Sequence, residues 1–399
     1  MSDTAENGPR SPRQNDGSLH IAMIGTRGVP AQYGGFETAI EEIGQRLVKR
    51  GHRVTVYCRT KGAGTEHLGM QRIELPSMKR RSLETLSNSA LACTHAALRL
   101  RPDMAFVFNS ANSPWLPILR SVKIPIALHT DGLEWQRSKW GRVGRQYYWR
   151  AESWGVKWAD ELISDAQGIA DYYQGRFAVG SNVIAYGAPI VHPAVEPITA
   201  LGLQPRGYDL IVARLEPENH VREGLEGALG ATGDRPIVFV GSNPYPTDYA
   251  TEVDKIARGN DRVLALGSVW DQELLDSLYA HARVYIHGHS VGGTNPSLLR
   301  AMGAGAAVAA YDVSFNREVL DDGSMLWGSA GRLTQLLEQT ADEKLAALGE
   351  VNQAHVAAKY RWDDVTSGYE DLAYKLVNGG KANRCSNSSS VQPTGNEAR

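Results

Sequence analysis

The sequence lacks features that mark several classes of protein. It has only three cysteines in 399 residues, Cys58, Cys93 and Cys385, and no two of them form a CxxC pair. We therefore expect neither a disulfide framework nor a zinc site, and a reducing compartment fits this cysteine usage. The net charge is only −2, from 42 basic and 44 acidic side chains. A partner recognised through bulk positive charge, such as nucleic acid, is therefore not expected.

Long apolar runs are also missing. Residues 1–17 are polar and contain no apolar stretch of the kind that a secretory signal needs. The most apolar late segment, residues 301–310, is far shorter than the roughly 20 residues that cross a bilayer. We therefore expect a cytoplasmic protein with no signal peptide and no membrane-spanning segment. Its hydrophobic content of 42% is nevertheless enough for buried cores, and its length predicts two to three domains.

Strand and helix patterns alternate along most of the chain. Residues 20–24 form a short apolar run, and the apolar residues Phe36, Ile40, Ile43 and Leu47 then recur at helical spacing. A second strand pattern follows at 53–57, so this region predicts a βαβ unit and a parallel sheet. Further strands are predicted at 72–75, 104–108, 124–128, 161–164, 209–213, 236–240, 263–266, 283–287 and 306–310.

A proline-containing stretch at 187–207 interrupts this alternation and breaks helix and sheet alike, so it predicts a linker between two similar halves. The predicted fold class is α/β, with one parallel-sheet domain at 19–190 and a second at 191–360. Apolar residues at helical spacing predict a final helix over 361–378 that packs against one or both domains. Residues 1–18 and 379–399 are almost without apolar side chains and are predicted to be disordered.

A glycine-rich loop, residues 25–35, connects the first strand to the first helix. Free amides and the helix dipole favour an anion at such a place, and glycines let the backbone approach it closely. The spacing of Gly25 and Gly28 does not match the G-x-G-x-x-G pattern, and the second strand ends in Cys58-Arg59 without an acidic residue. NAD is therefore not expected. The alternative interpretation is a turn that binds no ligand.

Polar side chains also follow the strand predicted at 124–128. Because ligands bind at the carboxyl ends of parallel strands, His129, Asp131 and Glu134 would face a cleft. The alternative is a turn that Asp131 begins with Gly132, beside a core histidine at position 129.

In the second half, Arg214 comes directly after a predicted strand. A guanidinium there can bind a diphosphate with two hydrogen bonds and stabilise charge on a leaving phosphate. The alternative is a surface ion pair with Glu216 or Glu218.

The run 287–302 combines two glycines with a predicted helix start. Asn295 is typical of an N-cap and Pro296 of a first helical position, while Gly292 and Gly293 expose the backbone to an anion. This pattern predicts a second phosphate site. His287 and His289 lie two residues apart, but no acidic or cysteine partner completes a metal site, so zinc is not expected.

Together these segments resemble the retaining GT-B glycosyltransferases of glycosyltransferase family 4. More narrowly, they are similar to the rhamnosyltransferase-like branch of bacterial polysaccharide enzymes. The resemblance rests on five runs that occur in order over both halves, residues 25–30, 33–38, 131–135, 214–219 and 292–299.

This resemblance implies two Rossmann-like domains that face a cleft, with a C-terminal helix that crosses back to the first domain. It implies catalytic roles for Arg214 and for His129 and Asp131, of which one faces the donor sugar. The donor-binding residues that it implies are Arg214, Asn219, Gly292, Gly293, Thr294, Asn295, Ser297, Leu298 and Arg300. The residues implied for the diphosphate or acceptor loop are Gly28, Tyr33, Gly34, Gly35 and Glu37, and those for the acceptor side are Glu134 and Trp135.

Three positions depart from the wider family. That family usually has a lysine a few residues after the arginine, where this chain has Glu218-Asn219-His220. It also has two glutamates eight positions apart, where this chain has Gly292 and Arg300. The first glutamate contacts sugar hydroxyls of the donor and the second contacts its ribose hydroxyls. A 2′-deoxyribose donor such as dTDP-rhamnose would need the second contact less.

The function that the resemblance implies is transfer of a sugar, best matched by rhamnose, with retention at the anomeric carbon. The donor would be a nucleoside-diphosphate sugar, and the acceptor a glycan or polyprenyl-linked molecule in cell-surface polysaccharide synthesis. No metal or other cofactor is expected, because protein cations and amides would offset the charge on the diphosphate.

The segment between Trp135 and Trp158 favours an anionic membrane surface at the inner face of the cell membrane. It interleaves six basic side chains and one acidic side chain with aromatic residues. The alternative is a set of core aromatics beneath solvated charges. The basic residues are Arg137, Lys139, Arg142, Arg145, Arg150 and Lys157, and the aromatic residues are Trp140, Tyr147, Tyr148, Trp149 and Trp154.

Two other functions stay open. A sugar-nucleotide epimerase would use the same fold and release free sugar without an acceptor. A degenerate transferase acting as a scaffold or sensor would account for the absence of both family glutamates. The presence of Arg214, both glycine loops and the 131–135 run argues against such decay.

Overall fold

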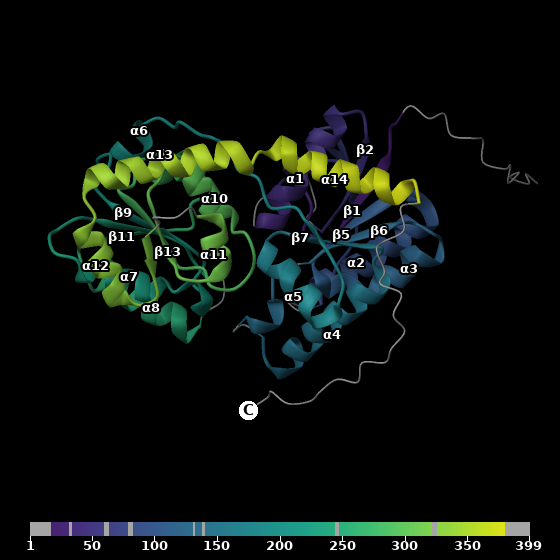
Figure 1. Cartoon of the computed structure of the whole chain (residues 1–399), viewed down its shortest axis with the longest axis horizontal. Coiled ribbons are helices and arrows are strands. Elements are labelled where there is room, and N and C mark those ends of the chain that lie inside the picture. Colours follow the sequence, from purple (N-terminus) through teal and green to yellow (C-terminus); the bar gives the residue numbers. More distant parts are fainter. Residues whose placement is uncertain are drawn as a thin grey trace, which may run out of the picture.

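The computed structural model describes residues 17–31, 34–59, 64–78, 83–130, 132–137, 140–243, 247–320 and 325–379. They form two α/β domains, each built on its own sheet (Figure 1). This arrangement confirms the predicted fold class, two Rossmann-like domains with mostly parallel strands. None of the described helices is long and apolar enough to cross a membrane.

The first domain holds an eight-stranded sheet in the order β3-β4-β2-β1-β5-β6-β7-β8, parallel except for the β3–β4 pair. Strands β1 and β5 are buried along their whole length, which explains their continuous apolar sequences. The strands are β1 (His20–Ile24), β2 (Arg53–Cys58), β3 (Glu66–His67), β4 (Met70–Glu74), β5 (Met104–Phe108), β6 (Ile126–His129), β7 (Glu161–Ser164) and β8 (Asn182–Val183). The helices are α1 (Gly35–Lys49), α2 (Glu84–His95), α3 (Leu116–Ser121), α4 (Arg142–Trp158) and α5 (Gln167–Phe177), with short helical segments at Ala96–Leu100, Ser110–Trp115 and Glu134–Gln136.

The second domain holds a six-stranded parallel sheet in the order β11-β10-β9-β12-β13-β14. Its strands are β9 (Asp209–Val212), β10 (Ile237–Val240), β11 (Val263–Gly267), β12 (Val284–His287), β13 (Val308–Tyr311) and β14 (Met325–Trp327). Its helices are α7 (Val221–Gly230), α8 (Asp248–Arg258), α9 (Gln272–His281), α10 (Pro296–Gly303), α11 (Ser314–Val319), α12 (Ala330–Gln339) and α13 (Asp342–Lys359), with a short segment at Pro217–Asn219.

The connection between the domains differs in one respect from its prediction. The proline-containing stretch 187–207 was expected to break helices, yet it includes the short helix α6 (Glu196–Thr199). Pro197 lies in the first turn of α6, where proline is tolerated because the missing N–H has no partner within the helix.

The C-terminal helix α14 (Trp362–Val377) crosses back to the first domain, as the resemblance implied (Figure 1). Helix α13 packs on α10 of the second domain, whereas α14 packs on α1. Arg50 and His52 both contact the carboxylate of Glu370 in α14, at 2.6 and 2.8 Å. The chain thus joins the two domains at a second place.

The chain ends are partly outside the described residues. Residues 1–16 and 380–399, predicted to be disordered, cannot be compared with the structure, and Cys385 is among them. Gly17 and Ser18 differ from that prediction, because Tyr374 donates a hydrogen bond to Gly17 O at 2.5 Å and Ser18 donates one to Gly51 O at 2.7 Å.

Each sheet has a topological switch point, a strand from which the strand order runs outward to both edges of the sheet. In the first domain β1 pairs with both β2 and β5, and in the second β9 pairs with both β10 and β12. Loops that leave two such neighbouring strands diverge to opposite sides, which opens a crevice at their carboxyl ends. This topology predicts that ligands bind beside the loops after β1, β5, β9 and β12.

Candidate functional site

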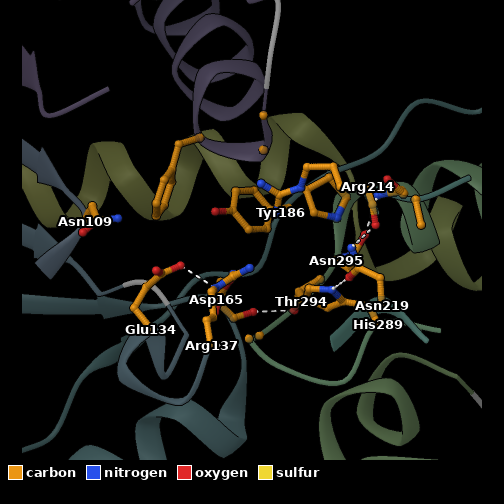
Figure 2. A pocket seen from close by; sticks show the side chains of 18 of the residues that line it. Asn109, Glu134, Arg137, Asp165, Tyr186, Arg214, Asn219, His289, Thr294 and Asn295 are labelled. Atoms are coloured by element: carbon orange, nitrogen blue, oxygen red, sulfur yellow. Dashed lines mark hydrogen bonds and ion pairs between the residues drawn. The ribbon is translucent and has the colours of Figure 1, made fainter. Parts of the chain in front are cut away.

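Two adjoining cavities lie where these loops meet. The first cavity has a volume of about 480 Å³ and is lined by residues after β1, β5, β9 and β12, among them Gly35, Asn109, Arg214 and His289 (Figure 2). The second cavity has a volume of about 810 Å³ and extends toward Trp270 on the second domain. The two share part of their lining, including Gly34, Gly35, Glu37, Tyr186, Val212, Pro296 and Ser297.

Most of the residues that the sequence singled out line these cavities. The first cavity is lined by Gly34, Gly35, Glu37, Glu134, Arg214, Asn219, Gly292, Gly293, Thr294, Asn295 and Ser297. The second is lined by Gly28, Gly34, Gly35, Glu37, Ser297 and Arg300. Candidates from both halves of the sequence, such as Gly35 and Arg214, therefore line the same cavity at the domain boundary. Tyr33 and Asp131 lie outside the described residues.

Three candidates do not line either cavity. Leu298 is fully buried in the hydrophobic core. The indole of Trp135 lies beside Glu152. His129 is enclosed by the rings of Phe36, Phe108 and Tyr186, with centroids 5.1 to 6.0 Å away.

The surroundings of His129 favour a packing role. Complete burial lowers the pKa of its imidazole to about 4, so the ring is neutral at physiological pH. Its Nδ1 lies 3.2 Å from the carbonyl oxygen of Thr130. The core histidine that was the alternative interpretation fits this geometry, and a catalytic role for His129 stays a prediction.

Glycines let the two domains approach each other at the site. A Cβ on Gly35, at the start of α1, would lie 2.8 Å from the ring of Pro296 in α10. Gly132 packs against the backbone of Gly292 so closely that a Cβ would overlap it. Side chains at these positions would therefore push the domains apart.

The start of α10 has the predicted cap. The Asn295 side chain accepts hydrogen bonds from the amides of Ser297 at 2.9 Å and Leu298 at 3.4 Å. These two amides were expected to bind phosphate, and they already have a partner. Within the described chain, the amides of Gly293, Thr294 and Asn295 form no hydrogen bond, so the amides available to an anion lie in the loop before the helix.

Arg214 is held by its backbone while its guanidinium stays available. Asn219 donates from Nδ2 to Arg214 O at 2.8 Å, and its Oδ1 lies 2.7 Å from His289 Nδ1. Because the amide nitrogen of Asn219 faces a carbonyl, the His289 nitrogen that faces the amide oxygen carries the proton. Among the described residues Arg214 forms no ion pair, so the surface pair with Glu216 or Glu218 that was the alternative does not form.

Sequence reasoning missed or misjudged several residues of the first cavity, Trp140 and Tyr148 of the expected membrane-facing segment among them. Arg137 was expected on a membrane-facing segment, yet it is buried and its Nε lies 2.5 Å from Glu134 Oε1. Asp165 and Asn109 follow β7 and β5, so the rule about strand ends could have found them. Tyr186 lies after β8 in the approach to the linker, where nothing in the pattern marked it.

Arg300 occupies the position where the resemblance placed a ribose-binding glutamate. Its Nε and Nη2 contact Asp276 Oδ1 and Oδ2 at 2.6 and 2.8 Å. Arg300 itself lines the second cavity. A guanidinium only donates hydrogen bonds, so Arg300 cannot accept the protons of a ribose as a glutamate would.

No group of three His, Cys, Asp or Glu side chains that could hold a metal is present among the described residues. His287 is buried and His289 is half-buried, and desolvation lowers the pKa values of both, that of His287 to about 3. The expectation that no metal is needed stays a prediction.

Comparison with known proteins identifies the class of enzyme. Residues 33–187 match the family model described as Glycosyltransferase Family 4, and residues 210–348 match the model described as Glycosyl transferases group 1. The chain is a glycosyltransferase of the GT-B type. No curated protein matches its sequence.

Solved structures share the fold of this glycosyltransferase at low sequence identity. A sucrose-phosphate synthase from Thermosynechococcus elongatus has 18% identity and a TM-score of 0.75, and the match covers 90% of this chain and 99% of that one. HepE from Anabaena in complex with UDP-glucose has 17% identity and a TM-score of 0.71, over 89% and 99% of the two chains. The catalytic domain of starch synthase IV from Arabidopsis thaliana, bound to ADP and acarbose, has 14% identity and a TM-score of 0.71, over 90% and 100%.

Proposed function

We propose that this glycosyltransferase moves rhamnose from dTDP-rhamnose, with retention, to a glycan or polyprenyl-linked acceptor in cell-surface polysaccharide synthesis. The observation that carries a nucleoside-diphosphate donor is that Arg214, which forms no ion pair with any described residue, lines the same cavity as the loop before α10. HepE and starch synthase IV have the same fold and were solved with UDP-glucose and ADP. A cation beside unused amides at a switch point is suited to phosphate.

The donor would extend through both cavities. The indole of Trp270, 73% exposed, offers a flat face for a nucleobase in the second cavity. The diphosphate would pass the shared wall at Pro296 and Ser297 into the first cavity. The Arg300–Asp276 pair replaces an acceptor for ribose hydroxyls, and a 2′-deoxyribose such as that of dTDP-rhamnose has one hydroxyl fewer to satisfy.

The reaction would proceed on one face of the sugar. The bond between the anomeric carbon and the phosphate oxygen breaks, and its electron pair goes to the diphosphate. The acceptor hydroxyl oxygen bonds to the same face of the oxocarbenium-like sugar, and the hydroxyl proton passes to the departing phosphate. Arg214 and the amides of Gly293 and Thr294 would stabilise the charge that develops on the diphosphate.

An acceptor carried by a membrane is supported by the outer face of α4. Arg142, Val143, Arg145, Trp149 and Arg150 are exposed there, with Val143 at 83% and Trp149 at 48%. A face that combines basic and apolar side chains suits an anionic lipid surface. The inner side of the same helix contributes Tyr148 to the first cavity, so an acceptor at the membrane would lie near the donor.

The experiment that tests the donor is thermal unfolding with dTDP-rhamnose, UDP-glucose, a GDP-sugar and NADP. A ligand at 100 times its dissociation constant stabilises the folded protein by about 2.7 kcal/mol. We expect dTDP-rhamnose to raise the unfolding midpoint most and Arg214→Ala to lose that increase. Arg222, an exposed arginine on α7 outside both cavities, provides the matched control in Arg222→Ala.

The outcomes separate the open functions. No shift with any sugar nucleotide would contradict the transferase proposal and favour a scaffold. A shift followed by release of a free sugar that is an epimer of rhamnose, without an acceptor, would favour an epimerase. For the membrane, flotation with vesicles containing an anionic lipid should recover the wild-type protein and much less of an Arg142→Gln/Arg145→Gln/Arg150→Gln variant. Equal recovery of both would contradict the membrane-facing role of α4.

A further inference from the structure

The side chain of Arg137 belongs to the first cavity although it comes from the first domain. It follows the short segment Glu134–Gln136 and is only 8% exposed. Figure 2 shows it beside Glu134 and Asp165, opposite Arg214 and Asn219 of the second domain. The four exposed basic residues of helix α4 lie outside the cavities, so Arg137 differs from them in its surroundings.

The two edges of the Arg137 guanidinium face different partners. Its Nε lies 2.5 Å from Glu134 Oε1, and Trp140 Nε1 donates to the other oxygen of Glu134 at 3.0 Å. Its Nη2 points to Gly292 in the second domain, 3.8 Å from the place where a Cβ on Gly292 would lie. Glu134 therefore orients the Arg137 guanidinium by contacting one edge, and the opposite edge faces Gly292.

Arg137 and Arg214 approach the same point from opposite domains. His289 Nε2 lies 3.1 Å from the Cβ position of Gly292, beside the outer edge of Arg137. Burial holds the pKa of His289 well below its usual range, and the charges of Arg137, His287 and Arg214 lower it further. The neutral His289 ring thus stands between two guanidinium groups.

We propose that Arg137 is a catalytic residue, the second cation that neutralises the departing diphosphate, and that the first domain delivers it when the two domains meet. This inference rests on the proposed nucleoside-diphosphate donor. As the bond to the anomeric carbon breaks, the electron pair moves to the phosphate oxygen. Arg214 then faces that added charge from the second domain and Arg137 faces it from the first.

The charges in the cavity explain why a second cation is needed. At neutral pH the cationic side chains among its described lining residues are Arg137 and Arg214, whereas Glu37, Glu134 and Asp165 carry carboxyl groups. Without Arg137, a diphosphate would face these carboxylates with one guanidinium to offset them. Such repulsion is screened less between the walls of a protein cavity than in bulk water.

The position of Arg137 also predicts which phosphate it contacts. It lines the first cavity but not the second, which holds Trp270 and Arg300. A nucleotide whose base lies beside Trp270 would bring only its distal phosphate close to Arg137. A nucleoside monophosphate would therefore not need Arg137, but a nucleoside diphosphate would.

The test compares Arg137→Gln with Arg332→Gln, a change at an exposed arginine on α12 that lines neither cavity. Calorimetric titration measures the Kd of dTDP and of dTMP, and UDP and UMP serve if the uridine series binds better. In Arg137→Gln we expect the diphosphate Kd to rise at least tenfold and the monophosphate Kd to change less than threefold. Turnover should fall about 100-fold, mostly in kcat, and Arg137→Lys should restore part of it. Arg332→Gln should match the wild type in all these measurements.

A second variant guards against misfolding. Removing Arg137 takes a charged partner from Glu134, so Glu134→Gln/Arg137→Gln removes both charges of the pair. It should show the same selective loss of diphosphate binding. The proposal is overturned if Arg137→Gln binds dTDP within twofold of the wild type with unchanged kcat, or if both ligands weaken equally. If the wild type binds neither diphosphate, the proposed donor class fails first.

Discussion

Gly293 of the second domain lies directly against the carboxylate of Asp165 in the first, so that a Cβ at position 293 would overlap the carboxylate oxygens. The neighbouring Thr294 donates a hydrogen bond from its hydroxyl to Asp165 O at 2.5 Å. The closed arrangement of the two domains therefore depends on a glycine at this position, and the first cavity is complete only when the domains meet here.

Gly293→Ala should disable the enzyme without unfolding it. The added methyl group has to displace Asp165 or separate the domains, and a misplacement of about 1 Å at a reacting site costs roughly 100-fold in rate. We expect kcat to fall by about that factor while circular dichroism stays unchanged. Gly331→Ala is the matched control, because a Cβ on Gly331 in α12 meets nothing within 4 Å. Wild-type turnover in Gly293→Ala would contradict the role of this contact.

Glu318 should hold the domains together from another side. Its carboxylate, on α11, accepts hydrogen bonds from the amides of Gln167 at 2.6 Å and Gly168 at 3.3 Å, at the start of α5. Helix α5 has no side-chain cap of its own, so a residue of the other domain supplies it. Glu318→Gln should weaken closure by about 1 kcal/mol. Measured by small-angle scattering without ligand, the Glu318→Gln variant should have a larger radius of gyration than the control variant Glu350→Gln. Glu350 is exposed on α13.

The Arg300–Asp276 pair should set the preference between deoxyribose and ribose. In Arg300→Glu/Asp276→Asn, the glutamate can accept hydrogen bonds from ribose hydroxyls, and the asparagine avoids a clash of like charges. We expect the affinity for UDP to rise about tenfold relative to dTDP, the value of one well-placed hydrogen bond. Arg317 and Asp312 form the same two-bond geometry outside both cavities, so Arg317→Glu/Asp312→Asn is the control. An unchanged UDP-to-dTDP ratio would contradict a role for the pair in donor choice.

His129 should make the fold sensitive to acid. Its pKa is about 4 in the folded protein and about 6.5 when unfolded, so below pH 6.5 the unfolded chain binds the proton first. This difference removes up to about 3 kcal/mol of stability as the pH falls from 6.5 to 4. His129→Phe, which keeps the aromatic packing, should unfold in urea with a shallower pH dependence over this range. Loss of kcat in a stable His129→Phe protein would instead support a catalytic role.

Much of the fold could be predicted from the sequence because its signals are local. The buried strands β1 and β5 are continuous apolar runs, and α1 has apolar residues at helical spacing. The cap at Asn295 is a contact between neighbours in the chain, so it too was confirmed. The two-residue strands β3 and β8 and the three-residue β14 were missed, because so few residues carry no detectable period.

The sequence by itself determined two parallel α/β domains and the loops at their strand ends. Apolar periodicity and the residue types that follow a strand are both features of residues close together in the chain. Only the tertiary structure decided which side chains enter the site. Arg137 turns inward against Glu134 and faces Gly292, His129 is enclosed by aromatic rings, and Arg300 is bound by Asp276. These outcomes depend on how segments that are separated in the chain pack against one another, and such contacts leave no periodic signal in either segment.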